Sequence, residues 1–214
     1  MYRRLIEHLK SWKESQNRKP MILRGARQVG KTWLMKEFGR TCYKKCAYIS
    51  MDENEVMEEV FRDAFDISRI ITALEIAVGF QIEPGNTLII FDEVQEIPRA
   101  LKALKYFCEN APEYHVIAAG SLLGVALHEG TSFPVGKVEF CDLYPMDFWE
   151  FLKACGEDGL ADLLAARDYG LISDFKNKYM DYLKYYYYVG GMPEVVSVFS
   201  EERDMKQVRV IQKR

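Results

Sequence analysis

The sequence lacks paired Cys-x-x-Cys spacings and contains only five cysteines and three histidines among its 214 residues. An odd set of cysteines without such pairs argues against a disulfide framework. No histidine lies at ligand spacing from a cysteine, which argues against a structural zinc site. We therefore expect reduced thiols, the usual state of cysteine in the cytosol.

Long hydrophobic runs are also missing. The longest weakly polar stretch, Val116 to Leu127, contains two glycines and a serine, and it is well short of the ~20 apolar residues that a membrane helix needs. The basic start of the chain is followed by Glu7, His8 and Lys10, where a secretory signal needs an uninterrupted apolar segment. We expect a cytoplasmic protein with no membrane segment.

The chain has no large excess of either charge, because 29 basic residues stand against 32 acidic ones and leave a formal net charge of −3. This balance does not support nucleic-acid binding by the chain alone. Arg99, Lys102 and Lys105 share one expected helical face and are a candidate contact for a phosphate backbone. A solvated surface is the commoner explanation for such a stripe. The apolar share of 49% indicates an ordinary globular protein.

Apolar residues recur with alternating strand and helix spacing over the first two thirds of the chain. Tyr2 to Trp12 has helical spacing, and Trp33, Leu34 and Phe38 predict the inner face of another helix. Gly39 fits the end of that helix. The expected strands are short apolar runs at Met21–Leu23, Ala47–Met51, Leu88–Phe91, His115–Ala119 and Val138–Leu143. This alternation predicts a doubly wound α/β fold, a parallel sheet flanked by helices.

From residue 144 onward the apolar spacing is helical throughout. We divide the chain into a leading helix at 1–18, a core at 19–143 and an all-helical part at 144–214. The last residues, Val208 to Arg214, show no turn or capping signal, so we expect this pattern to be truncated. Tyr185 to Tyr188 precede two glycines that would stop a helix. These tyrosines either stack on a purine or, more commonly, pack the helical part.

The most specific motif lies between an expected strand and an expected helix. It matches G-x-x-x-x-G-K-[ST] and comprises Gly25, Ala26, Arg27, Gln28, Val29, Gly30, Lys31 and Thr32. Such a loop curls its backbone N–H groups around phosphate oxygens, and the helix N-terminus adds its positive dipole end. Lys31 is predicted to reach the β- and γ-phosphates and Thr32 to join the Mg²⁺ shell, with Trp33 completing the nucleotide-binding segment. A degenerate loop that binds nothing is the main alternative.

Asp92 and Glu93 directly follow an apolar strand. Strands of a parallel sheet deliver their terminal side chains to a ligand crevice, so Asp92 is predicted to hold Mg²⁺ through water and Glu93 to polarise an attacking water. Alone, such a pair usually marks a solvated strand end. Ser121 follows another strand and is predicted to sense the γ-phosphate or position water, with a turn serine as the alternative. Gln95 either joins this site or caps the next helix.

Together these motifs resemble an AAA+-type family of prokaryotic P-loop ATPases. The resemblance rests on residues 25–32, 91–98, 119–121, 143–148 and 190–194, in the family's order. It implies the AAA+ strand order, ATP and Mg²⁺ as cofactors, a helical lid, and a C-terminal domain of uncertain, nuclease-like character beyond this N-terminal part.

The resemblance also implies roles for single residues. Lys31 and Thr32 belong to the first nucleotide motif, Asp92 and Glu93 to the second, and Ser121 lies near the first sensor position. Glu93, Lys31 and Ser121 are thus the candidate catalytic residues, and Thr32 and Asp92 the candidate metal ligands. Gly136-Lys137 stands where Gly-Arg is expected. Lysine lacks the guanidinium fork, so no arginine finger is assigned.

Three functions are compatible with these residues. The first is Mg²⁺-dependent ATP hydrolysis that drives an attached effector domain, slow or inactive in isolation if a second copy in a homo-oligomer completes the site. The second is a nucleotide-gated switch with little hydrolysis, which Glu93→Gln would leave unaffected. The third is a small-molecule kinase. The Asp-Glu pair and the lack of an obvious arginine-rich lid argue against the kinase.

Overall fold

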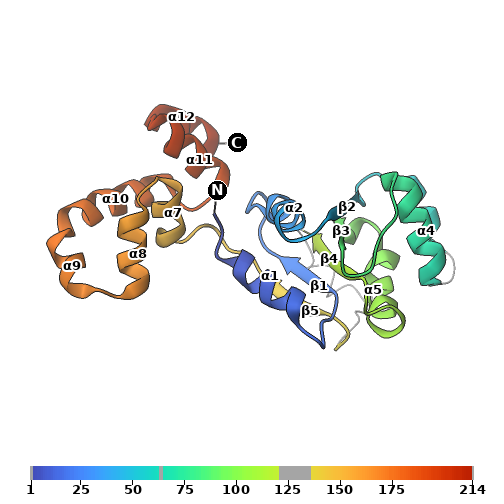
Figure 1. Ribbon diagram of the computed structural model, residues 1–214. Helices are drawn as coiled ribbons and strands as arrows, with labels where there is room; N and C mark the ends of the chain where they lie inside the picture. Colours follow the sequence, from blue (N-terminus) through green and yellow to red (C-terminus); the bar gives the residue numbers. More distant parts are fainter. Residues whose placement is uncertain (1, 63–64, 121–135, 214) are drawn as a thin grey trace. The chain divides into compact units, whose positions relative to one another are not determined.

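The computed structural model describes residues 2–62, 65–120 and 136–213, and its contacts divide the chain into two compact units (Figure 1). Residues 5–143 form one unit, which we call the sheet unit. Residues 1–4 and 144–214 form the other, which we call the helical unit.

The sheet unit contains a five-stranded parallel sheet with the order β2-β3-β4-β1-β5. The strands are β1 Met21–Arg24, β2 Lys45–Ser50, β3 Thr87–Asp92, β4 His115–Gly120 and β5 Glu139–Asp142. Strands β3 and β4 are buried at every residue, as expected for strands covered on both faces. The predicted α/β fold, a parallel sheet flanked by helices, is confirmed.

Helices cover both faces of this sheet (Figure 1). They are α1 Leu5–Glu14, α2 Lys31–Cys42, α3 Glu55–Arg62, α4 Ile67–Val78 and α5 Pro98–Asn110, with a 3-10 turn η1 at Val94–Glu96. Helices α1 and α2 share an apolar core with Leu23 and Ile90 of the sheet. Helices α3, α4 and α5 share another with Ile22 and Phe91. Because successive strand residues point to opposite faces, these two cores lie on opposite sides of the sheet.

The prediction that Trp33 points inward is wrong. Its side chain is 42% exposed, whereas Leu34, Met35 and Phe38 are fully buried against the sheet. With 3.6 residues per turn, a helix that buries positions 34, 35 and 38 turns position 33 toward its outer side.

The prediction that Gly39 ends this helix is also wrong, because α2 continues to Cys42. Gly39 is buried inside the helix, where a Cβ would lie 2.6 Å from Cys46 Sγ on β2. The glycine is therefore explained by close approach of helix and strand, and helix termination plays no part.

The helical unit contains α7 Phe148–Ala154, α8 Asp158–Ala166, α9 Tyr169–Asp174, α10 Lys176–Val189, α11 Pro193–Glu202 and α12 Met205–Gln212. One of its two small apolar cores includes Phe151 and Phe199, and the other includes Leu152 and Leu160. In the described ranges, no helix is both long and apolar enough to cross a membrane.

The first residues of the chain are packed into the helical unit. Arg3 is only 4% exposed, and its Nε lies 3.3 Å from Glu150 Oε1. The backbone N–H of Arg4 donates to the same oxygen at 2.7 Å. Glu150 also completes a capping box with Asp147 at the start of α7. The ion pair joins residues 147 positions apart, so periodicity alone does not reveal it.

Two of the motif segments, 143–148 and 190–194, come into contact within the helical unit. The N–H of Met146 donates to the carbonyl of Gly191 at 2.6 Å, and a Cβ at Gly191 would lie 2.3 Å from Met146 O. Gly190 ends α10 with a φ of 77°. The hydroxyl of Tyr186 donates to Met146 O at 2.8 Å. These contacts favour packing as the explanation for Tyr186.

His115 is buried at the start of β4, the opposite end of that strand from the motif loops. Its Nδ1 lies 2.7 Å from the hydroxyl of Tyr43. Burial lowers the pKa of the His115 imidazole to about 4, and the nearby charges of Arg18 and Lys13 act in the same direction. The imidazole is therefore neutral in the folded protein at neutral pH.

We expect the free energy of unfolding to fall as the pH is lowered from 6.5 toward 4. In the unfolded chain His115 binds a proton near its ordinary pKa, whereas in the folded chain it binds one only near pH 4. The stability that comes from keeping His115 neutral is therefore fully present only above pH 6.5. Its loss amounts to about 2 to 3 kcal/mol. Urea unfolding at several pH values measures it. His115→Gln, which keeps an acceptor for Tyr43, should flatten the profile, and identical profiles would contradict the assignment.

Candidate functional site

The loop between β1 and α2 has a backbone shape that side chains rarely adopt. Gln28 has a φ of 62° and Gly30 a φ of 95°, both in the left-handed region. Gly25 has no room for a side chain, since a Cβ would lie 2.4 Å from the carbonyl oxygen of Leu143. Gly30 offers no side-chain cap to α2. The first N–H groups of α2 are therefore not capped from that position, which suits an anion.

The remaining residues of the loop differ in burial. Val29 is fully buried and anchors the loop in the core beneath α1 and α2. Ala26, Arg27 and Gln28 are exposed. The middle of the loop is thus open to solvent while its end is fixed, as a loop that wraps a ligand requires.

Lys31, the first residue of α2, is only 7% exposed. Its Nζ donates to the carbonyls of Gly25 at 2.9 Å and Ala26 at 2.8 Å. Burial lowers the pKa of this ammonium group, while the charges of Glu93 and Asp92 oppose the shift. The ammonium is held at the loop by backbone carbonyls, which phosphate oxygens can replace.

Asp92, the last residue of β3, is 3% exposed, and its carboxylate accepts three hydrogen bonds from described residues. Its Oδ2 accepts from Thr32 Oγ1 at 2.6 Å and from the hydroxyl of Tyr48 at 3.0 Å. Its Oδ1 accepts from the backbone N–H of Glu93 at 3.2 Å. Thr32 and Asp92 are 60 positions apart in the sequence. The two motifs therefore meet through these two side chains.

Glu93 and Gln95 lie at the turn after β3. Glu93 has a φ of 50° and starts the 3-10 turn η1, an element that the sequence pattern does not predict. Gln95 Nε2 donates to Glu93 Oε2 at 2.7 Å and to Glu96 Oε1 at 3.1 Å. Gln95 Oε1 is buried and has no hydrogen-bond partner among the described residues. No side chain caps α5 at Ile97, so Gln95 contacts the Glu93 carboxylate and is not a helix cap.

Some candidates lie elsewhere or outside the described residues. Ser121 falls between residues 120 and 136 and is not described. Lys137 Nζ lies 2.9 Å from Glu109 Oε1 of α5. Arg99 Nε donates to the carbonyl of Phe61, and its guanidinium stacks on Phe65, so at least one member of the basic stripe has a structural role.

Tyr48 is the residue of this site that sequence reasoning missed. It lies in the middle of β2, where an aromatic residue is explained by packing alone. Its contact with Asp92 depends on which strand pairs with β2 and in which register, and neither can be read from the sequence. The only available signal is a polar hydroxyl two residues before the end of an edge strand.

The donor set fits Mg²⁺ with few protein ligands. Carboxylate and hydroxyl oxygens of Asp92 and Thr32 are the hard donors that Mg²⁺ prefers, together with phosphate oxygens and water. Among the described residues, no group of three or more His, Cys, Asp or Glu side chains is arranged to hold a metal ion.

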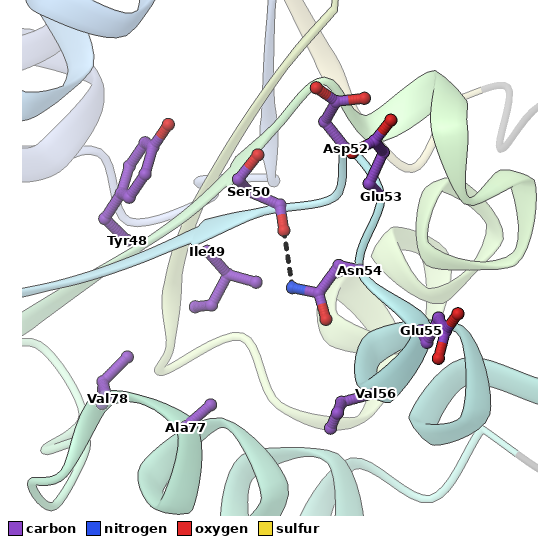
Figure 2. A pocket seen from close by; sticks show the side chains of 10 residues that line it. All are labelled: Tyr48, Ile49, Ser50, Asp52, Glu53, Asn54, Glu55, Val56, Ala77 and Val78. Carbon is purple, nitrogen blue, oxygen red and sulfur yellow. Dashed lines mark hydrogen bonds between the residues drawn. The ribbon is translucent and has the colours of Figure 1, made fainter.

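A separate hollow of about 560 Å³ lies beyond the end of β2 (Figure 2). Asp52 and Glu53 lie on one side of it, and Ala77 and Val78 of α4 lie on the other. Asn54 spans its middle and donates to the Ser50 carbonyl at 2.8 Å. Its lining includes none of residues 25–32, but it does include Tyr48, whose hydroxyl contacts Asp92.

Known structures share this fold at low sequence identity. The Walker-type ATPase PABY2304 of Pyrococcus abyssi is 16% identical with a TM-score of 0.56, and the match covers 96% of this chain and 69% of that one. The Drosophila ORC structure, bound to DNA, is 15% identical with a TM-score of 0.55, covering 97% and 65%. C. elegans PCH-2 is 12% identical with a TM-score of 0.52, covering 97% and 67%. This chain thus spans about two thirds of their length.

Comparison with curated proteins gives no match. Comparison with protein families does, since the AAA domain matches residues 17–152. That range includes β1, the loop, α2, β3 and Glu93, and it covers more than half of the chain. Membership supports nucleotide binding and ATPase activity in general terms. With its parallel sheet, its phosphate-loop motif and this match, the chain belongs to the AAA domain family of P-loop ATPases.

Proposed function

We propose that this chain binds ATP together with Mg²⁺ and hydrolyses it at the carboxyl end of β1 and β3. The observation that carries the proposal is the 2.6 Å hydrogen bond between Thr32 Oγ1 and Asp92 Oδ2. It joins the phosphate-loop motif to the acidic end of β3, where parallel sheets of this kind bind ligands. Mg²⁺, when bound, supplies charge neutralisation for the phosphates.

Each residue of the site has a separate task in this proposal. The N–H groups at the start of α2 and the ammonium of Lys31 bind and orient the phosphates. Thr32 and Asp92 hold the cation, and the carboxylate of Glu93 accepts a proton from the attacking water. Glu93 Oε2 accepts a hydrogen bond from Gln95 Nε2 at 2.7 Å. To accept a proton from water, the carboxylate must either give up this hydrogen bond or use an acceptor site that the bond leaves open.

We propose in addition that the helical unit acts as a lid and transmits nucleotide state to an effector domain C-terminal to it. This part rests on the family resemblance. Turnover of the isolated chain is expected to be slow if a charge from a second copy completes the site, since such a group contributes roughly 10³-fold or more in other P-loop enzymes. The choice of ATP as the nucleotide also rests on the family resemblance. The loop contacts phosphates and does not distinguish one base from another.

Calorimetric titration of ATP, with Mg²⁺ and with EDTA, tests the proposal. We expect Mg²⁺ to tighten ATP binding by the parent, and Asp92→Asn to reduce that gain by about tenfold because the amide holds a cation poorly. Asp66→Asn is the matched control, since Asp66 caps α4 and asparagine caps a helix equally well. A parent that binds no Mg·ATP would refute the proposed function.

A further inference from the structure

Tyr48 reaches Asp92 because of the register between two parallel strands. Tyr48 of β2 is paired with Ile90 of β3, and both pack on the sheet face that α1 and α2 cover. Asp92 lies two residues beyond Ile90 and therefore on the same face. The phenol extends along this face toward the strand end, and its hydroxyl lies 3.0 Å from Asp92 Oδ2.

The hydrogen bonds to Asp92 are unevenly shared between its two oxygens. Oδ2 accepts from both Thr32 and Tyr48, whereas among the described residues Oδ1 accepts only from the Glu93 N–H. Each carboxylate oxygen has roughly two acceptor sites. Oδ2 is therefore filled, and Oδ1 keeps a free site on the carboxylate for the hydration shell of a cation.

The phenol of Tyr48 is itself held in place by a neighbouring side chain. Lys36 Nζ of α2 lies 3.6 Å from the centre of the Tyr48 ring, a cation–π contact that restrains it. The hydroxyl donates its hydrogen to Asp92 Oδ2, because a carboxylate oxygen can only accept.

We propose that Tyr48 is a positioning residue for the metal part of this site: its hydroxyl fixes the Asp92 carboxylate in the orientation that holds Mg²⁺. The inference rests on the proposed Mg·ATP function and deepens it. Tyr48 acts through Asp92, whose carboxylate accepts the hydrogen bond from its hydroxyl. Removing the hydroxyl should therefore weaken the response to Mg²⁺ and leave the phosphate contacts of Lys31 and α2 intact.

Tyr48→Phe removes the hydroxyl and keeps the ring beneath Lys36. ATP affinity is measured by calorimetry at a series of free Mg²⁺ concentrations and in EDTA. We expect the Mg²⁺ concentration for half-maximal tightening to rise about tenfold, the usual cost of losing an outer-shell partner. Affinity in EDTA should change by less than about twofold. Tyr106→Phe is the matched control, because this tyrosine of α5 stacks on Phe65 and packs against the core on the opposite face of the sheet from Tyr48.

A double variant separates positioning from a general structural effect. On an Asp92→Asn background, Tyr48→Phe should change the Mg²⁺ requirement by less than about twofold. Tyr48 acts on the cation only through the Asp92 carboxylate, which this background has already lost. An unchanged Mg²⁺ requirement in Tyr48→Phe would overturn the inference, as would equal losses of affinity with and without Mg²⁺. A parent that is insensitive to Mg²⁺ would instead refute the proposed function, and the inference with it.

Discussion

Lys31→Ala is expected to weaken Mg·ATP binding by about 100-fold or more. The ammonium group is buried at the loop and, in the proposed complex, exchanges the carbonyls of Gly25 and Ala26 for phosphate oxygens. Truncating one partner of such a desolvated charge pair costs about 3 kcal/mol or more, which corresponds to about 100-fold in affinity. Calorimetric titration with Mg·ATP measures the loss.

Lys44→Ala is the control for the change in net charge. Lys44 is exposed just beyond the end of α2, so its loss should alter affinity by less than about twofold. The folded fraction of both variants is checked by circular dichroism. If Lys31→Ala binds Mg·ATP as the parent does, the phosphate site has been placed wrongly.

Glu93→Gln is expected to slow ATP hydrolysis by about 100-fold or more while leaving Mg·ATP affinity nearly unchanged, because a positioned general base contributes about 10² to 10⁴ in rate. The amide has the shape of the carboxylate but cannot take a proton from water. Phosphate release at saturating Mg·ATP measures the rate, and calorimetry on the same samples measures affinity.

Glu96→Gln provides a closely matched control. Glu96 receives a hydrogen bond from the same Gln95 amide as Glu93 but is exposed. Its replacement should leave hydrolysis within about twofold of the parent. Equal, residual hydrolysis in the parent and in Glu93→Gln would favour a nucleotide-gated switch over an ATPase.

Local features of the fold could be predicted from the sequence because they depend on neighbouring residues. The strand, loop and helix around residues 21–42 follow from an apolar run, two glycines and a helical spacing. The burial of β3 follows from Leu88 to Phe91 without interruption. These signals also placed Asp92 at a strand end. Their motifs assign Thr32 and Asp92 to one metal site, but the direct hydrogen bond between these residues, 60 positions apart, was not predicted.

Features that depend on pairing between distant segments could not be predicted. The contact of Tyr48 with Asp92 needs the register of β2 on β3, and the position of Gly39 needs the closeness of α2 to Cys46. The prediction for Trp33 was wrong because a large apolar residue next to Leu34 is expected to face the core, whereas its side chain is exposed. An aromatic residue at the start of a helix can equally lie on its outer side.

The first and last residues of the family match are poor choices for the ends of an expressed fragment. The match begins at residue 17, yet a chain cut there would lose Leu9 and Trp12, which fill the core between α1 and the sheet. It would also lose Arg3 and leave Glu150 buried without its guanidinium partner, which is strongly destabilising. The match ends at residue 152, and a cut at that point would divide α7. Fragments for biochemical work therefore need to extend beyond sequence similarity at both ends.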